Sequence, residues 1–253
     1  ERMVDIVPCA EMVRFGKNGS DATSAAVRLA RAFTGRDRLA VCGYHGWRDW
    51  YIGTTTRDKG VPGAVAALSH SFPYNDLEAF DKLLASHPGE FAAVVMEPMN
   101  VTEPGPGYLD GVRDLVHSHG ALLVFDEIIT GFRFALGGAQ ELFGVAPDLA
   151  CFGKGMANGM PVSAVLGRAD VMGEIEEIFF SATFGGETLS LAAAIAVIDK
   201  MRREPVIETL WSTGQRLAEG ARAAAKSHGL EDVVEFAGMP PWMFVVFKDR
   251  PNA

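Results

Sequence analysis

Short apolar runs alternate with amphipathic helical stretches over most of the chain, from about residue 13 to about residue 201. We expect strands near residues 39–42, 92–96, 121–125, 149–152 and 162–166. Helical spacing of apolar residues predicts helices over 20–34, 76–86, 107–118, 169–178 and 188–203. Alternation of this kind predicts an α/β fold with a mostly parallel sheet and helices on both of its faces.

The pattern changes after Pro205. A long amphipathic helix is expected over 206–227, followed by strands near 233–236 and 242–247. Gly238-Met239-Pro240-Pro241 is typical of a turn between those two strands. We therefore divide the chain into a large domain, residues 1–204, and the beginning of a smaller C-terminal α/β domain, residues 205–253.

Polar residues stand where the predicted strands end. Lys154 follows one apolar run, between Gly153 and Gly155, and Asp126 follows another. Ligands of open parallel sheets bind beyond the carboxyl ends of the strands. A lysine and an aspartate at two such ends favour a Schiff-base lysine that faces the partner of a pyridinium nitrogen, which is the arrangement used with pyridoxal 5′-phosphate (PLP). An isolated Gly-Lys-Gly loop or a strand-ending acidic pair would be the plainer alternatives.

A phosphate site is predicted at the start of the first long helix. Asn18-Gly19-Ser20-Asp21 precedes it, with Ser20 as the candidate N-cap, and Gly35 stands where the helix should end. The free N–H groups and the positive dipole end of a helix N-terminus attract phosphate groups. Ordinary N-capping without an anion remains the alternative for this segment.

Two side chains are candidates for the faces of a flat ring. Tyr44 leaves the strand near 39–42 and could stack on a heterocycle, or it could simply cover the core. Strand alternation puts Ile128 on the same face as Asp126, from which it could press on the opposite face of the ring. Glu97 follows a further apolar run and points toward the same edge of the sheet.

In this order and context, the segments resemble those of class III aminotransferases of the type I PLP fold. The similarity is strongest to the branch related to glutamate-1-semialdehyde aminomutase. It extends over essentially all 253 residues. The matching segments are Asn18 to Ala22, Tyr44 to Gly46, Glu97-Pro98, Asp126 to Arg133, Gly138 to Lys154, and Ala182 to Glu187.

The resemblance implies a role for each matching residue. Lys154 would hold PLP as a Schiff base and move protons, and Asp126 would pair with the pyridine nitrogen. Tyr44 would stack on one face of the ring and Ile128 would pack on the other. The remaining residues implied to bind the cofactor are Gly19 and Ser20 at the phosphate, together with His45, Glu97, Asn100 and Thr183.

The resemblance also implies an activity and an assembly. An aminotransferase of this family moves an amino group from an amine to a keto acid or aldehyde. An intramolecular aminomutase, or a PLP-binding homologue without turnover, is the alternative. Thr183 would reach the phosphate of a neighbouring subunit, so a homodimer with shared active sites is implied.

The sequence departs from the family pattern at several points. Only residues 1–15 precede the phosphate segment, and the small domain stops soon after 242–247, so we expect N- and C-terminal parts of the family to lie outside this chain. Glu187 stands where many relatives have Asn-Pro or His-Pro, and Trp47-Arg48-Asp49 differs from the aminomutase. These departures leave the substrate open.

Composition restricts the possible partners. The net charge is −9 and no basic run is present, which argues against nucleic acid and anionic membranes. The three cysteines have no metal-ligand spacing, so no metal site is expected, and their odd number fits a reducing compartment. No apolar run approaches a membrane span and the first residues lack a signal-peptide core, so we expect a cytoplasmic protein.

Two other nucleotide-dependent classes fail on spacing. A dinucleotide fold needs Gly-x-Gly-x-x-Gly, but after Gly153 and Gly155 the next glycine is Gly159, one residue too far along. A P-loop needs Ser or Thr directly after its Gly-Lys pair, and Gly155 occupies that position here.

Overall fold

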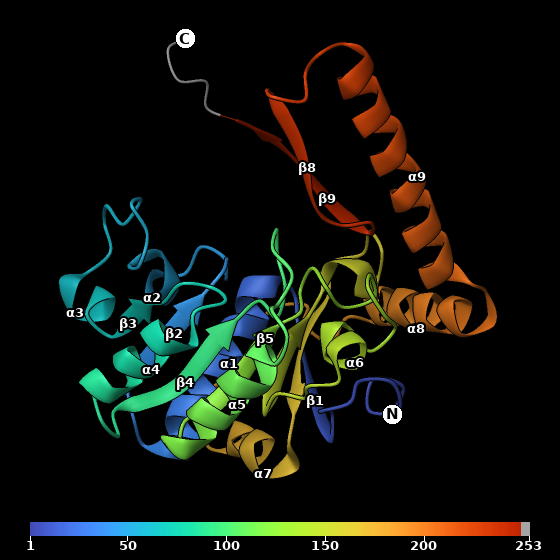
Figure 1. The fold of residues 1–253 in the computed structure, drawn as a ribbon. Helices are drawn as coiled ribbons and strands as arrows, with labels where there is room; N and C mark the ends of the chain where they lie inside the picture. The colour runs from blue at the N-terminus through green and yellow to red at the C-terminus, as the bar shows by residue number, and fades with distance from the viewer. Residues whose placement is uncertain (249–253) are drawn as a thin grey trace.

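The computed structural model describes residues 1–248, which form a seven-stranded sheet and a separate two-stranded hairpin (Figure 1). The strand order of the large sheet is β1-β7-β6-β5-β4-β2-β3. Its strands are β1 Met12–Gly16, β2 Arg38–Cys42, β3 Ser69–Ser71, β4 Phe91–Met96, β5 Leu122–Asp126, β6 Leu149–Phe152 and β7 Ser163–Gly167. Strands β3, β2, β4, β5 and β6 are parallel neighbours, whereas β7 runs antiparallel to β6 and to β1. The predicted mostly parallel sheet is confirmed.

Helices cover both faces of this sheet. The longer ones are α1 Gly19–Thr34, α4 Leu77–Ser86, α5 Tyr108–Ser118, α8 Thr188–Arg203 and α9 Val206–Ser227. The shorter ones are α2 Asp49–Ile52, α3 Gly63–Ala66, α6 Ala139–Phe143 and α7 Ala169–Met172. Strand alternation produces the two layers: in β4, Val94 packs with the core under α4 and α5, and Val95 packs with the core under α1.

Three local expectations were wrong. The helix expected over 169–178 ends as α7 at Met172 and continues as a 3₁₀ turn, Gly173–Glu176. The strands β1 and β3 were not predicted, and β3 is short and polar. The helix α1 begins at Gly19 and is capped by Asn18, not by Ser20, although its C-terminal glycine, Gly35, is left-handed as expected.

The C-terminal part consists of α9 and the hairpin β8 Val234–Met239 and β9 Trp242–Phe247. Figure 1 shows both projecting away from the body of the large sheet. The turn is shorter than predicted, because Gly238 and Met239 belong to β8. The division into two domains near Pro205 stays a prediction, and its last residues, 249–253, lie outside the described range. None of the helices within residues 1–248 is long and apolar enough to cross a membrane.

Candidate active site

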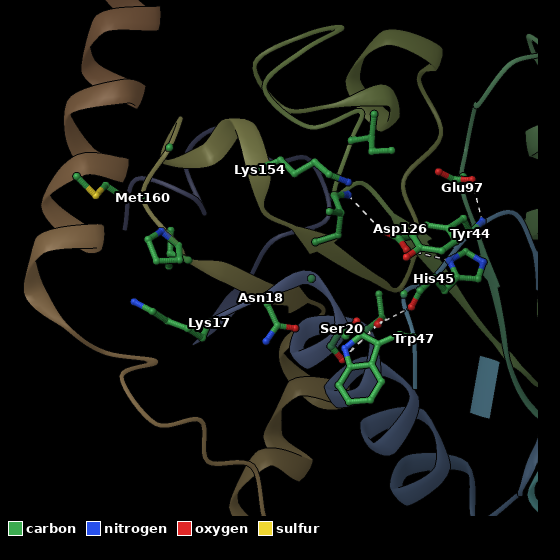
Figure 2. Close-up of a pocket in the computed structure, with 18 residues that line it drawn as sticks. Lys17, Asn18, Ser20, Tyr44, His45, Trp47, Glu97, Asp126, Lys154 and Met160 are labelled. Carbon is green, nitrogen blue, oxygen red and sulfur yellow. Dashed lines mark hydrogen bonds and ion pairs between the residues drawn. The ribbon is translucent and has the colours of Figure 1, made fainter. Parts of the chain in front are cut away.

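A cavity of about 520 Å³ opens at the carboxyl ends of the parallel strands (Figure 2). Its volume lies in the range of about 300–1,000 Å³ that is typical of small-molecule sites. The end of β2, the end of β4, the end of β5, the segment after β6 and the first turn of α1 all contribute to its wall. Of the residues predicted to bind a cofactor, those that line it are Gly19, Ser20, Tyr44, His45, Glu97, Asp126, Ile128 and Lys154.

The first turn of α1 forms one end of the cavity. The Asn18 side chain accepts a hydrogen bond from the Asp21 amide at 3.1 Å, and the Asp21 carboxylate accepts one from the Asn18 amide at 3.1 Å. This capping box leaves the amides of Gly19 and Ser20 without an acceptor among the described residues. Two free amides at a helix N-terminus are suited to hold a phosphate group.

The loop after β2 lies directly on this turn. Gly46 has a φ of 94°, which residues with a side chain rarely adopt. A Cβ on it would also lie 2.2 Å from Ser20 Oγ, so glycine is the residue that suits this contact between the loop and α1. The Thr23 hydroxyl donates to the backbone carbonyl of His45 at 3.3 Å and fixes the loop from below. The Tyr44-His45-Gly46 segment is therefore held in place by α1.

Asp126 is buried at the bottom of the cavity and has donors on both oxygens. His45 Nδ1 lies 2.9 Å from Oδ2, and the Ile128 amide donates to Oδ1 at 3.2 Å. His45 Nε2 faces the Cys42 carbonyl at 3.2 Å, which can only accept, so this nitrogen carries a proton. The imidazole is therefore held between the Asp126 carboxyl group and the Cys42 carbonyl, one at each ring nitrogen.

Lys154 begins a 3₁₀ turn directly after Gly153, with a left-handed φ of 40° that is uncommon for a residue with a side chain. Its side chain reaches over the cavity toward Asp126 (Figure 2), and its amine makes no hydrogen bond with the described residues. Partial burial lowers the pKa of this amine below its ordinary value, although Asp126 and Glu97 act in the opposite direction. A lysine with a lowered pKa carries more of the neutral, nucleophilic amine near neutral pH.

Glu97 and Tyr44 lie together at the far side of the cavity. The Tyr44 amide donates to Glu97 Oε2 at 3.0 Å, while burial raises the pKa of the Glu97 carboxyl. The Tyr44 ring is 59% exposed and touches Tyr51 edge-on, with ring centroids 5.8 Å apart. One face of Tyr44 is therefore available for stacking on a flat ligand.

Asn100 and Thr183 lie outside this cavity. Asn100 Oδ1 accepts from the Val101 amide at 2.6 Å, so its side chain closes its own turn. Thr183 is exposed and lines a second hollow, of about 1,020 Å³, which shares Lys17, Asn18 and Trp47 with the first. The predicted roles of Asn100 and of Thr183 in a neighbouring subunit stay predictions.

Glu127, the neighbour of Asp126, joins two segments of the chain through hydrogen bonds that the sequence did not predict. Its fully buried carboxylate accepts from Thr130 Oγ1 at 2.7 Å, from the Ala139 amide at 2.5 Å, and from the amide and side chain of Gln140 at 3.1 and 3.0 Å. Burial raises the pKa of Glu127, but its partners are donors, which favours the ionised form. The sequence shows both segments, Asp126 to Arg133 and Gly138 to Lys154, but no local pattern indicates that Glu127 contacts Ala139 and Gln140.

Glu187, which departs from the family pattern, caps α8 and forms an ion pair with Lys17. Its carboxylate caps α8 by accepting from the Leu189 and Ser190 amides at 2.8 and 3.0 Å, and it pairs with Lys17 Nζ at 2.9 Å. The hydrogen bond with the Ser190 side chain and the Lys17 ammonium lower the pKa of Glu187 to about 2. Lys17 lines the cavity beside the first turn of α1, so the Lys17–Glu187 ion pair joins α8 to that turn.

The family model of class III aminotransferases matches residues 1–244. The chain belongs to this family. Class III aminotransferases are PLP enzymes. A curated relative, the 3-aminobutyryl-CoA aminotransferase of Cloacimonas acidaminovorans (strain Evry), is 36% identical over 255 residues, which cover 98% of this chain and 60% of the relative.

Two solved structures share the fold. The FumI protein of Sphingopyxis sp. MTA144, in its PLP internal aldimine form, superposes with a TM-score of 0.91 at 32% identity, over 98% of this chain and 61% of that one. A β-phenylalanine aminotransferase from Variovorax paradoxus superposes with a TM-score of 0.82 at 29% identity, over 97% of this chain and 59% of that one. This class III aminotransferase chain thus spans about 60% of the length of the relatives it matches.

Proposed function

We propose that the protein is a PLP-dependent aminotransferase that moves an amino group from an amine donor to a carbonyl acceptor. One observation carries the proposal. Lys154 and Asp126 come from the ends of neighbouring parallel strands, β6 and β5, and line the same cavity. Composition and fold alone would not require a reactive amine and a buried carboxylate to meet there.

The residues present fit the cofactor at each of its parts. The free amides of Gly19 and Ser20 would hold the phosphate. Asp126 would accept from the protonated pyridine nitrogen, because its oxygens line the cavity while His45 and Ile128 hold the carboxylate in place. The flat ring would lie between the available face of Tyr44 and the Ile128 side chain. When bound, PLP supplies the electron sink that takes up negative charge from the substrate carbon.

The protein side chains then position groups and move protons. The Asp126 carboxylate would lie beside the ring nitrogen, where a negative charge would favour the protonated ring. Lys154 Nζ would hold the cofactor and, as a free amine, would accept a proton from the substrate carbon and return it at a neighbouring position. The lowered pKa of the Lys154 amine supports this exchange, because a base works best when its pKa is near the working pH.

We propose substrates whose amino group is on the β carbon. The names of two relatives support this substrate class, since one is a 3-aminobutyryl-CoA aminotransferase and the other a β-phenylalanine aminotransferase. An intramolecular aminomutase would use the same groups with one substrate as donor and acceptor. A homologue that binds PLP without turnover is the third possibility.

We further propose a homodimer with shared active sites that works in the cytoplasm. Large apolar side chains are exposed around Thr183, including Phe179 at 80%, Phe184 at 71% and Leu189 at 64%. Exposed apolar groups in such number on one segment support a partner surface. Three free, buried cysteines, Cys9, Cys42 and Cys151, support a reducing compartment.

The test starts with the full-length protein loaded with PLP. Borohydride reduction and peptide mapping should place the pyridoxyl group on Lys154, and Lys17 is the matched internal control because it lines the same cavity. A pyridoxyl group on Lys17 would overturn the assignment. Donors are then screened in matched α- and β-amino pairs, with spectral loss of bound PLP as the readout. Attachment at Lys154 without conversion by any donor would identify the homologue that lacks turnover.

A further inference from the structure

A loop between β5 and α6 connects the C-terminal unit to the active site. Arg133 Nε donates to the Ile129 carbonyl at 3.0 Å, and its Nη1 donates to the Pro241 carbonyl at 3.2 Å. Pro241 lies in the turn of the β8–β9 hairpin. A second link comes from α9, where Trp211 Nε1 donates to the Phe134 carbonyl at 2.9 Å.

The same loop packs against the turn that carries Lys154. A Cβ on Gly155 would lie 3.3 Å from Phe132 Cβ and 3.4 Å from the Gly131 carbonyl oxygen, so the two backbones are in close contact. The Phe132 ring meets Phe152 of β6 edge-on, with centroids 5.8 Å apart. A displacement of the loop would therefore be transmitted to the turn at Lys154 and Gly155.

Charged groups from three elements influence the pKa of the Lys154 amine. Asp126 at the end of β5 and Glu97 after β4 contribute negative charge, and Arg133 contributes positive charge from the loop. Lys17 also lines the cavity, but its ammonium is paired with Glu187. Arg133 is thus the cation that opposes the two carboxylates around this amine, and it lowers the pKa of Lys154.

We propose that Arg133 is a positioning residue that couples the placement of the C-terminal unit to the reactivity of Lys154. Its guanidinium is held by the hairpin turn on one side and by the Ile129 carbonyl on the other. A fixed cation beside the amine favours the neutral form, and its influence falls as the distance increases. A shift of the hairpin away from Arg133 would free the guanidinium to move toward water, and the amine would become harder to deprotonate. This inference rests on the proposed role of Lys154 in amino transfer.

The test measures the Lys154 amine directly, without turnover. Full-length protein freed of cofactor is labelled with formaldehyde and a mild hydride reductant over a range of pH, and the methylation of the Lys154 peptide is followed by mass spectrometry. Only the neutral amine reacts, so the pH midpoint reports its titration. R133M should raise the midpoint by about half a unit or more, the size expected for one nearby partly solvated charge. R133K keeps the charge and should stay near the wild-type midpoint.

Trp211→Phe is the matched control, because it removes the other hydrogen bond between the C-terminal unit and the loop but leaves the Arg133 charge and the Arg133–Pro241 contact in place. It should leave the midpoint unchanged. An unchanged midpoint in R133M would overturn the proposal, because the Arg133 charge would then have no effect on the amine. Equal shifts in R133M and W211F would also overturn it, because a less ordered loop would then explain both. If R133M does not fold, R133Q provides the same loss of charge with a polar side chain. Failure of the pyridoxyl mapping would contradict the amino-transfer role separately, because the labelling midpoint needs no cofactor.

Discussion

His45 Nδ1 lies 2.9 Å from Asp126 Oδ2 at the bottom of the cavity, joining two segments that are 81 residues apart in the chain. The imidazole is fully buried, stacks on Trp50 at 6.2 Å between centroids, and has a carbonyl acceptor at its other nitrogen. A side chain placed in this way touches Asp126 rather than the faces of a bound ring. The structure therefore supports an indirect role for His45, in which it orients the Asp126 carboxyl group.

Replacing His45 by leucine should leave one Asp126 oxygen buried without its donor. Such a loss costs about 1–3 kcal/mol. We expect a lower melting temperature and at least about a tenfold loss in kcat/KM, since 1.36 kcal/mol in the barrier is a factor of ten. His117→Leu is the matched control. His117 Nε2 also lies 2.9 Å from an aspartate oxygen, Asp148 Oδ2, but Asp148 directly precedes β6, at the amino end of that strand. Equal kinetic losses in the two variants would argue against a role at the site.

Asp126→Asn should impair turnover while the chain remains folded and binds PLP. The neutral amide cannot stabilise a protonated pyridine nitrogen, and a hydrogen bond to a charged group is worth about 1.5–3 kcal/mol. Turnover should fall at least about tenfold. Steady-state kinetics on PLP-loaded protein, with cofactor content measured by absorbance, would check this. Turnover near the wild-type value at full loading would mean that Asp126 does not serve the ring nitrogen.

Gly46→Ala should weaken both the fold and PLP binding. The added Cβ would lie 2.2 Å from Ser20 Oγ and 3.2 Å from Ser20 Cβ, so the Ser20 side chain in the first turn of α1 would have to move. Gly60→Ala is the control, because Gly60 has a similar φ of 96° with nothing within 4 Å of an added Cβ. Backbone strain alone costs roughly 1–2 kcal/mol, which G60A should show. G46A should lose more stability than G60A in urea unfolding and should also bind PLP more weakly; equal effects would contradict a steric role.

Much of the site follows from local sequence, since an apolar run followed by one polar residue marks a strand and its carboxyl end. That pattern was enough to place Lys154, Asp126 and Glu97 at one edge of a parallel sheet, where the structure has them. Strand alternation likewise predicted Ile128 on the cavity wall, and the Asn18 to Asp21 helix start predicted Gly19 there. These features depend on neighbours within a few residues.

Features that depend on contacts between distant segments were missed. Glu127 directly follows β5, and its carboxylate accepts hydrogen bonds from Ala139 and Gln140. The fold alone brings these residues next to Glu127. Ser20 and Asn18 are both good N-cap residues, and the choice of Asn18 follows from its reciprocal contact with Asp21. The antiparallel β1 was missed because its pairing partner, β7, lies about 150 residues further along.

The Glu187 carboxylate should contribute to stability in a pH-dependent way. Its pKa is lowered to about 2 in the folded chain from an ordinary value of 4.5, so its contribution is fully present above pH 4.5 and is lost as the pH falls toward 2. The melting temperature of Glu187→Gln should therefore lie below that of the wild type at pH 6, and the difference should shrink between pH 4.5 and 3. A difference that does not depend on pH would show that the capping geometry matters and the charge does not.

Thr183→Ala should weaken PLP binding without unfolding the chain. Thr183 is exposed in the loop before α8 and lies outside the cavity of its own chain, so a direct effect on PLP requires a second subunit. We expect the dissociation constant for PLP to rise several-fold in the dimer, and wild-type protein diluted to monomer to release PLP. Ser181→Ala is the control from the same hollow. The two properties are measured together, by fluorescence of bound PLP and by sedimentation. Retention of PLP by a wild-type monomer, or equal affinity in T183A and S181A dimers, would show that the threonine does not cross to a neighbouring phosphate.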